Sequence, residues 1–156
     1  MDLSDNLKKV NLLLKSRSIN RWELIDEMVD LAVKNREINE PDAEEIKKSL
    51  IEREKSMSTA IGKGVAIPHC STSRVADIVV LMAIVPKGID FDASDGQLVK
   101  IVIMLLVPKS KLTQHIKTLA NIAKLMSNEI LRDTLLILKT PEKIIQTIKD
   151  FENPKK

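Results

Sequence analysis

Two unbroken apolar runs in the middle of the chain, Ile78 to Val85 and Ile101 to Val107, constrain the fold most strongly. A strand with one face in water alternates apolar and polar residues, so continuous runs indicate strands that are covered on both faces. A shorter run, Val65 to Ile67, comes before them, and the turn-rich segment Asp90 to Gly96 joins the two long runs. The sequence therefore predicts a sheet with other elements packed on both sides.

Helical patterns occupy the chain before and after these runs. Asn20 and Glu23 form a pair typical of a helix N-terminus, and Pro41 is well placed as the first residue of another helix. The segment 10–14 fits either a strand or a helix, because Leu13 breaks an otherwise alternating pattern. We expect helices over 21–35, 41–55, 112–127, 129–138 and from 140 onward. The predicted fold class is α/β, a mixed β-sheet flanked by helices on both faces.

Length and composition favour a single globular domain over residues 1–156. The chain is 44% apolar and 30% charged, as is usual for soluble proteins. Its net charge of +3 is spread along the sequence, and no aromatic residues interleave with basic ones, so nucleic acid is not expected as a ligand. The single cysteine and the absence of a signal-peptide pattern predict a cytoplasmic protein. Direct membrane insertion is not expected, because the longest apolar run is far shorter than a bilayer span.

The segment from Ser58 to His69 holds the densest concentration of unusual residues, with two of the four glycines and one of the two histidines. Its glycines match neither the dinucleotide-binding fingerprint nor the phosphate-binding P-loop. We expect a loop that enters a short strand ending at Pro68 and His69. A neutral imidazole at this position can accept a phosphoryl group directly. On position alone, a surface or hydrogen-bonding histidine that only caps the strand is the favoured alternative, because histidine catalysis must be argued from geometry and pKa.

Two more polar residues stand on apolar helical stripes. His115 shares or borders a stripe of the predicted helix 112–127, either as a hydrogen-bonded core histidine or as a site residue. Arg53 occupies the vacant position of another stripe, so it is predicted to point inward or along a cleft, or to reach water from the stripe's edge. That stripe consists of Ala43, Ile46, Leu50 and Met57. His69, His115 and Arg53 are therefore candidates for one shared site.

Metal and cysteine chemistry are not expected. The two histidines lack the spacing of a zinc site, and the acidic turn of Asp90, Asp92 and Asp95 lacks the glycine and glutamate of a calcium loop. Cys70 follows His69 directly, so on an extended chain the two side chains point to opposite sides and cannot form a nucleophile and base pair. We expect no metal and no cofactor.

Several short motifs follow one another in a fixed order between residues 18 and 150. They are Arg53-Glu54, Ser58-Thr59-Ala60-Ile61-Gly62-Lys63-Gly64-Val65-Ala66-Ile67-Pro68-His69, Pro86 to Phe91, Asp95-Gly96, Leu105 to Pro108, and His115-Ile116 with Leu119. In order and spacing they resemble the enzyme IIA domain of the bacterial phosphotransferase system, fructose/mannitol type, a branch that includes nitrogen-regulatory PtsN-like proteins. The resemblance implies the fold of that family and no cofactor.

The resemblance also implies roles for individual residues. His69 matches the phosphorylated histidine, His115 the second histidine that bonds to the phosphoryl group or the active imidazole, and Arg53 a basic residue at the edge of the site. Thr59 matches a residue whose hydroxyl lies near the phosphoryl group. The implied donor is an HPr-like phosphocarrier, and the implied acceptor is a IIB domain or a regulatory target protein. The sequence leaves open which acceptor is used, and therefore whether the protein serves sugar uptake or regulation.

Cys70 departs from this family pattern, because the residue after the active histidine is commonly glycine or another small residue. Cysteine is small enough to leave the assignment of His69 intact. An exposed thiol beside the site would, however, be open to oxidation.

Overall fold

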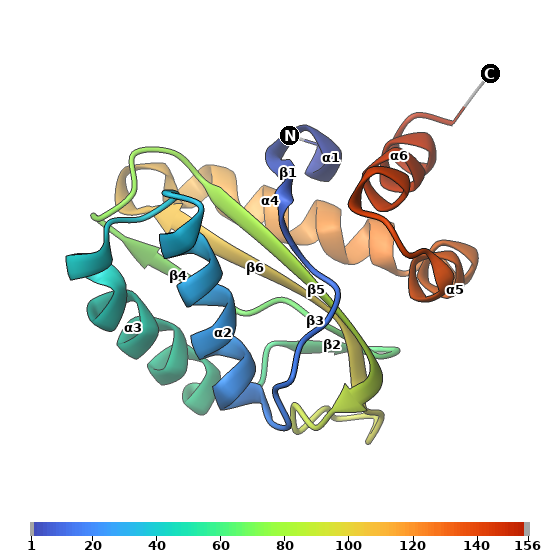
Figure 1. The fold of residues 1–156 in the computed structure, drawn as a ribbon, viewed down its shortest axis with the longest axis horizontal. Coiled ribbons are helices and arrows are strands. Elements are labelled where there is room, and N and C mark those ends of the chain that lie inside the picture. Colours follow the sequence, from blue (N-terminus) through green and yellow to red (C-terminus); the bar gives the residue numbers. More distant parts are fainter. Residues whose placement is uncertain (1, 155–156) are drawn as a thin grey trace.

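A computed structural model describes residues 2–154 (Figure 1). The strands are β1 (Leu7–Leu13), β2 (Ala60–Gly62), β3 (Val65–Ala66), β4 (His69–Thr72), β5 (Val79–Ile89) and β6 (Val99–Pro108). The α-helices are α1 (Leu3–Asn6), α2 (Arg21–Lys34), α3 (Ala43–Ser56), α4 (Leu112–Met126), α5 (Glu129–Ile137) and α6 (Pro141–Glu152). Two short 3-10 helices, η1 (Glu40–Asp42) and η2 (Lys109–Lys111), lead into α3 and α4. Within this part of the chain, no helix combines the length and apolar character needed to cross a membrane.

The two long apolar runs form the centre of one mixed six-stranded sheet. β5 and β6 pair antiparallel, with Val79 opposite Leu106 and Ile84 opposite Ile101. β1 adds to β5 in parallel, while β3 and β4 both lie parallel to β6 on its other side. β2 pairs antiparallel with β3. Strands far apart in sequence are thus brought next to β6, and one of them, β4, carries His69.

The sheet is covered on both faces, as the continuous apolar runs predicted. Alternate residues of β5 enter different clusters: Leu81 and Ala83 pack in one with α2 and α3, and Val80 and Met82 in the other with α1, α4, α5 and α6. Figure 1 shows α2 and α3 over one side of the sheet, with α4 on the other. The fold class, a mixed β-sheet flanked by helices on both faces, is confirmed.

The predicted helices agree with the structure to within a few residues, and their caps explain why. Asn20 accepts a hydrogen bond from the backbone N–H of Glu23 and so begins α2. Pro41 lies in the 3-10 turn η1 that precedes α3 and is not itself the first residue of the α-helix. The undecided segment 10–14 belongs largely to strand β1.

Two local expectations are wrong. The short strand does not end at Pro68 and His69; β3 stops at Ala66 and β4 begins at His69. Pro68 has no N–H for the ladder, but its carbonyl accepts from Leu105 N, so both short strands pair with β6 around it. Met57 is not buried but 71% exposed, because α3 ends at Ser56 and the chain turns extended there.

Candidate active site

A pocket of about 390 Å³ opens at the β4 edge of the sheet, between α3 and α4. It brings together three of the four candidate residues, because α3 supplies Arg53, β4 supplies His69 and α4 supplies His115. The remaining lining residues are Ser49, Cys70, Ser71, Val107, Leu112, Ile116 and Leu119. Thr59 does not line this pocket.

His69 is oriented by the backbone just before it. Its ring Nδ1 lies 2.8 Å from the carbonyl oxygen of Ile67. Since a carbonyl only accepts, Nδ1 carries the proton, and Nε2 holds the free lone pair. Burial and then the charge of Arg53 lower the pKa of His69, and they prevail over the Ile67 carbonyl and Glu54, which raise it. The ring is therefore neutral at pH 7, with Nε2 ready to act as a nucleophile.

His115 is buried on α4 with 6% of its surface exposed. Within residues 2–154 neither of its ring nitrogens has a hydrogen-bond partner. Burial, and then the charge of Lys111, lower its pKa, so this ring too is neutral at pH 7. A buried polar group without a partner costs about 1–3 kcal/mol. A histidine with both nitrogens free, in the wall of the pocket that His69 lines, is therefore poorly explained as a hydrogen-bonded core residue.

Arg53 stands near the C-terminal end of α3, at the wall of the same pocket. Its Nη1 donates to the carbonyl oxygen of Met57 over 2.7 Å. This bond fixes the side chain beside the end of its own helix, where the last carbonyls lack partners. The guanidinium thus faces a cleft, one of the positions predicted for it, and brings positive charge to the surroundings of His69.

The structure does not bring the Thr59 hydroxyl to the pocket. Thr59 is buried, and its Oγ1 donates to Glu54 Oε1 over 2.5 Å, while its backbone N–H donates to Glu54 Oε2 over 3.0 Å. The hydroxyl proton that the resemblance suggested for the phosphoryl group is thus engaged by a carboxylate. Thr59 is connected to the site through its backbone, because its carbonyl accepts from Ile67 N.

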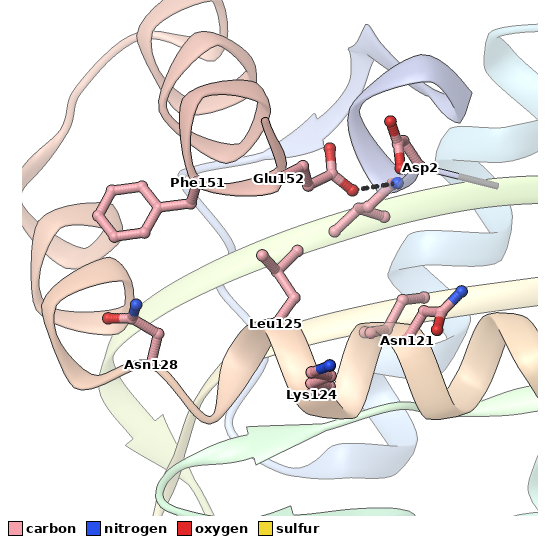
Figure 2. Close-up of a pocket in the computed structure, with 9 residues that line it drawn as sticks. Asp2, Asn121, Lys124, Leu125, Asn128, Phe151 and Glu152 are labelled. Atoms are coloured by element: carbon pink, nitrogen blue, oxygen red, sulfur yellow. Dashed lines mark hydrogen bonds between the residues drawn. The ribbon is translucent and has the colours of Figure 1, made fainter. Parts of the chain in front are cut away.

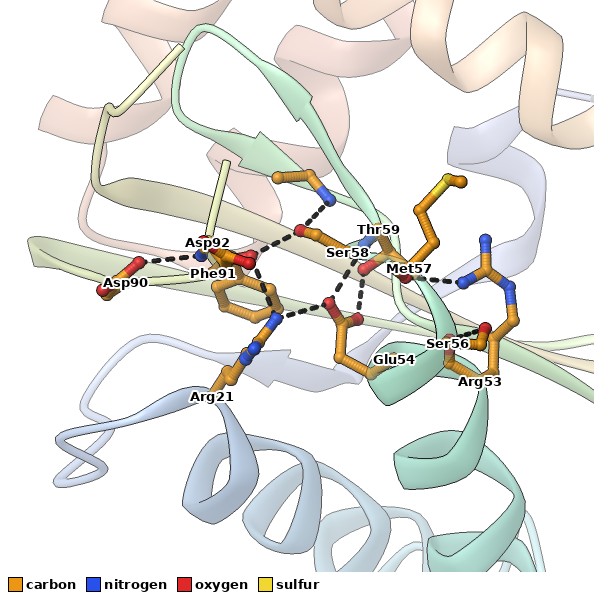
Figure 3. Close-up of polar contacts among 11 residues, drawn as sticks. Arg21, Arg53, Glu54, Ser56, Met57, Ser58, Thr59, Asp90, Phe91 and Asp92 are labelled. Carbon is orange, nitrogen blue, oxygen red and sulfur yellow. Dashed lines mark hydrogen bonds and ion pairs between the residues drawn. The ribbon is translucent and has the colours of Figure 1, made fainter. Parts of the chain in front are cut away.

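Sequence analysis missed a role for Glu54 and Arg21, which meet behind the site (Figure 3). The signal was available on α3: its buried residues Ala43, Ile46 and Leu50 are followed at the next helical step by Glu54 and not by Arg53. A step of four from Leu50 continues the stripe as well as a step of three. A glutamate is seldom fully buried, and so the apolar pattern was not extended to it.

Cys70 is buried in β4 and belongs to the core cluster that includes residues of α2 and α3, whereas His69 next to it is only partly buried. Burial raises the pKa of its thiol to about 11. Because only the thiolate is an effective nucleophile, this thiol is inert at neutral pH. The departure from the family pattern therefore adds a small buried side chain and not a redox group.

Other polar groupings have structural explanations. Asp95 accepts from the backbone N–H groups of Lys63 and Gln97, which makes it a turn residue. Across the described residues no group of three or more His, Cys, Asp or Glu side chains could hold a metal ion. A pocket of about 310 Å³ lies where α6 meets the start of the chain (Figure 2), and there Glu152 accepts from the backbone of Leu3 and Ser4. Glu152 therefore links α6 to α1.

Comparison with known proteins identifies a family for the chain. The family described as "Phosphoenolpyruvate-dependent sugar phosphotransferase system, EIIA 2" matches residues 5–151. The Nitrogen regulatory protein of Pseudomonas aeruginosa is 36% identical over 118 residues, covering 76% of this chain and 77% of that protein. The fructose-specific EIIABC component of Bacillus subtilis is 29% identical over 152 residues, and the match covers 97% of this chain but 24% of that longer protein.

The fold has close counterparts among solved structures. The crystal structure of Nitrogen Regulatory Protein IIA-Ntr from Neisseria meningitidis superposes with a TM-score of 0.84 at 25% identity, covering 94% of this chain and 98% of that one. The family match spans nearly all of the described residues, including the three elements that line the pocket. The chain belongs to the EIIA 2 family of the phosphoenolpyruvate-dependent sugar phosphotransferase system.

Proposed function

We propose that the protein is a phosphocarrier in which Nε2 of His69 accepts a phosphoryl group from the phosphohistidine of an HPr-like carrier and passes it to a downstream partner. The observation that carries this proposal is the bond between His69 Nδ1 and the Ile67 carbonyl, which leaves Nε2 unprotonated. His115 and Arg53 line the same pocket. A nucleophile, a neutral hydrogen-bonding ring and a positive charge are what phosphoryl transfer needs when no metal takes part.

In the proposed step the bond between phosphorus and the donor's ring nitrogen breaks as the bond from phosphorus to Nε2 of His69 forms. The donor histidine carries a proton on its other ring nitrogen, so it leaves as a neutral imidazole when its reacting nitrogen regains the electron pair of the broken bond. The proton on Nδ1 of His69 stays in place, so the phosphorylated ring gains positive charge next to the Ile67 carbonyl, whose dipole stabilises it. Arg53 and a ring N–H of His115 balance the charge on the phosphoryl oxygens.

The rim of the pocket suits a protein partner. Leu112 and Ile116 of α4 line the pocket yet are 54% and 66% exposed, and Met57, next to Arg53 in space, is 71% exposed. Apolar side chains around a charged centre are typical of a small transient interface. An HPr-like carrier and a downstream domain would use this rim in turn, each presenting its own reacting group to His69.

Two acceptors fit the proposed carrier. A IIB domain of a sugar transporter is favoured by the likeness to the Bacillus subtilis protein, whose name places a IIA part together with B and C parts. A regulatory target is favoured by the likeness to nitrogen regulatory proteins in sequence and in structure. In the second case the phosphorylation state of His69 would control binding, because a negatively charged phosphoryl group would be added to the centre of the rim.

Transfer assays separate these two acceptors. We expect incubation with an HPr-like carrier, its upstream enzyme and phosphoenolpyruvate to give an acid-labile, base-stable adduct on His69, located by mass spectrometry. The labelled protein is then mixed with candidate IIB domains. Transfer of the label to one of them assigns the sugar branch. Retention of the label with all of them, combined with target binding that changes on phosphorylation, assigns the regulatory branch. A wild-type protein that acquires no label contradicts the carrier proposal.

The lowered pKa of His69 predicts how phosphoryl uptake depends on pH. A lowered pKa means that the ring stays neutral to a more acidic pH than a free histidine does, so uptake should decline at a more acidic pH than the midpoint of a free histidine would predict. An NMR titration of the His69 ring should accordingly give a midpoint below that of the urea-unfolded chain. In the interval between these midpoints the unfolded chain binds more protons, so stability should rise with pH. A native midpoint above the unfolded one contradicts this prediction.

A further inference from the structure

Glu54 is a buried carboxylate directly behind the candidate site. Its side chain has no exposed surface, and it accepts three hydrogen bonds: from Thr59 N at 3.0 Å, Thr59 Oγ1 at 2.5 Å and Arg21 Nη1 at 3.2 Å. Figure 3 shows the carboxylate between the guanidinium of Arg21 and the backbone of Thr59. The charge is paired and hydrogen-bonded, which a buried carboxylate requires.

Hydrogen bonds to the carbonyl of Phe91 also hold the loop at residues 58 and 59, which precedes the site. The Arg21 guanidinium also donates to the carbonyl of Phe91 over 3.0 Å. That carbonyl accepts a short hydrogen bond from the Ser58 hydroxyl. The N-terminus of α2, the C-terminal turn of α3 and the Asp90–Asp92 turn therefore meet at residues 58 and 59 (Figure 3).

A continuous series of hydrogen bonds leads from this network to the imidazole. The backbone N–H of Ile67 donates to the Thr59 carbonyl over 3.0 Å, and the Ile67 carbonyl is the group that meets Nδ1 of His69 at 2.8 Å. Thr59 is held on one side by Glu54 and holds Ile67 on the other. The position of the Ile67 carbonyl, and with it the ring proton of His69, is thus connected to Glu54 through one residue.

We propose that Glu54, held by Arg21, is a positioning residue for phosphoryl transfer: it anchors Thr59 so that the Ile67 carbonyl keeps His69 in the tautomer with the proton on Nδ1. The inference rests on the proposed function for its consequence in transfer. A well-packed apolar residue commonly stabilises a fold as much as a buried ion pair does. The ion pair does more here, since it holds the backbone groups that orient the reacting ring.

The charges around His69 are consistent with this arrangement. Arg53 lowers the pKa of His69 and Glu54 raises it, so the ring lies within the influence of one positive and one negative side chain. Both come from successive positions at the end of α3, one facing the pocket and the other the core. Removal of the Glu54 charge should therefore lower the pKa of His69 further.

Glu54→Gln tests the proposal in the full-length protein. The amide keeps the volume but places an NH2 group against the donors of Thr59 or Arg21, so one of these bonds is lost. In the unphosphorylated protein, 15N NMR of the His69 ring should show the pure Nδ1–H tautomer for wild type and a mixture for the variant. Phosphoryl uptake should slow by about 10- to 100-fold, as expected for a misplaced reacting group. The pH midpoint of His69 should fall.

Two further variants keep the test decisive. Leu50→Ala removes a buried apolar side chain one turn earlier on α3 and lowers stability without touching the network. Thr59→Val removes only the hydroxyl that donates to Glu54 and serves if Glu54→Gln does not fold. We expect the wild-type tautomer in Leu50→Ala and a mixture in Thr59→Val.

Specific results would overturn the proposal. If Glu54→Gln, or Thr59→Val in its place, keeps the wild-type tautomer and uptake rate, Glu54 serves the fold alone. If Leu50→Ala produces the same mixture of tautomers, the effect comes from lost stability and not from the network. Because the tautomer is read in unphosphorylated protein, it is independent of the proposed function, which fails separately if wild-type His69 takes up no phosphoryl group.

Discussion

His69→Ala protein is expected to take up no phosphoryl group from a phosphorylated HPr-like carrier. The substitution removes the ring whose Nε2 has a free lone pair at the pocket and whose Nδ1 proton is held by the Ile67 carbonyl. Without a nucleophile there is no covalent intermediate, so the loss should be complete and not a matter of rate. The measurement is incorporation of labelled phosphate from phosphoenolpyruvate through the upstream enzymes.

Loss of the fold is not expected to account for this result. His69 is only partly buried, and the hydrogen bond lost with its ring contributes about 0.5–1.5 kcal/mol. Circular dichroism and thermal unfolding of His69→Ala and His69→Gln should therefore stay close to wild type. The chain offers a clean control, because it has two histidines. A second variant lacks both histidines. If His69→Ala still takes up label and this second variant does not, the phosphorylation site is His115.

Much of the fold could be predicted because burial of its apolar residues, which stabilises it most, is visible as short-range patterns in the sequence. The continuous runs of β5 and β6 predict burial on both faces, and alternate residues do enter two separate clusters. β4 could not be predicted in the same way, since its sequence from His69 to Thr72 is mostly polar. Its strand conformation comes from pairing with β6, and each paired residue of β6 lies 36 positions later in the chain.

The candidate site was predictable where a polar residue interrupts an apolar pattern. His115 stood out on its stripe, and the structure places it in the pocket with His69 and Arg53. Glu54 did not stand out, because its burial depends on Arg21, which is distant in sequence and reaches it only in the folded chain. Thr59 was predicted from resemblance, but its hydroxyl donates to Glu54, which lies only five residues earlier in the chain. Sequence patterns reveal a single polar residue in an apolar stripe. They do not reveal a buried charge whose ion-pair partner is distant in the sequence.

His115→Leu should separate the stability of the fold from its function. In the unphosphorylated protein neither ring nitrogen of His115 has a partner among residues 2–154, so an apolar side chain of similar size removes a cost of about 1–3 kcal/mol. The melting temperature should rise by about 2–4 °C for each kcal/mol gained in a chain of this length. A histidine buried only for packing would have no reason to carry that cost.

The same variant should be slower at passing the phosphoryl group on. A ring N–H of His115 that bonds to a phosphoryl oxygen would contribute about 1.5–3 kcal/mol, so its loss predicts onward transfer slower by about 10- to 150-fold. Uptake should be affected less, because His69 keeps its nucleophile and Arg53 its charge. Rapid-quench measurement of both steps decides the matter. Wild-type rates in both, together with a raised melting temperature, would make His115 a residue of the core and leave Arg53 as the phosphoryl ligand in this pocket.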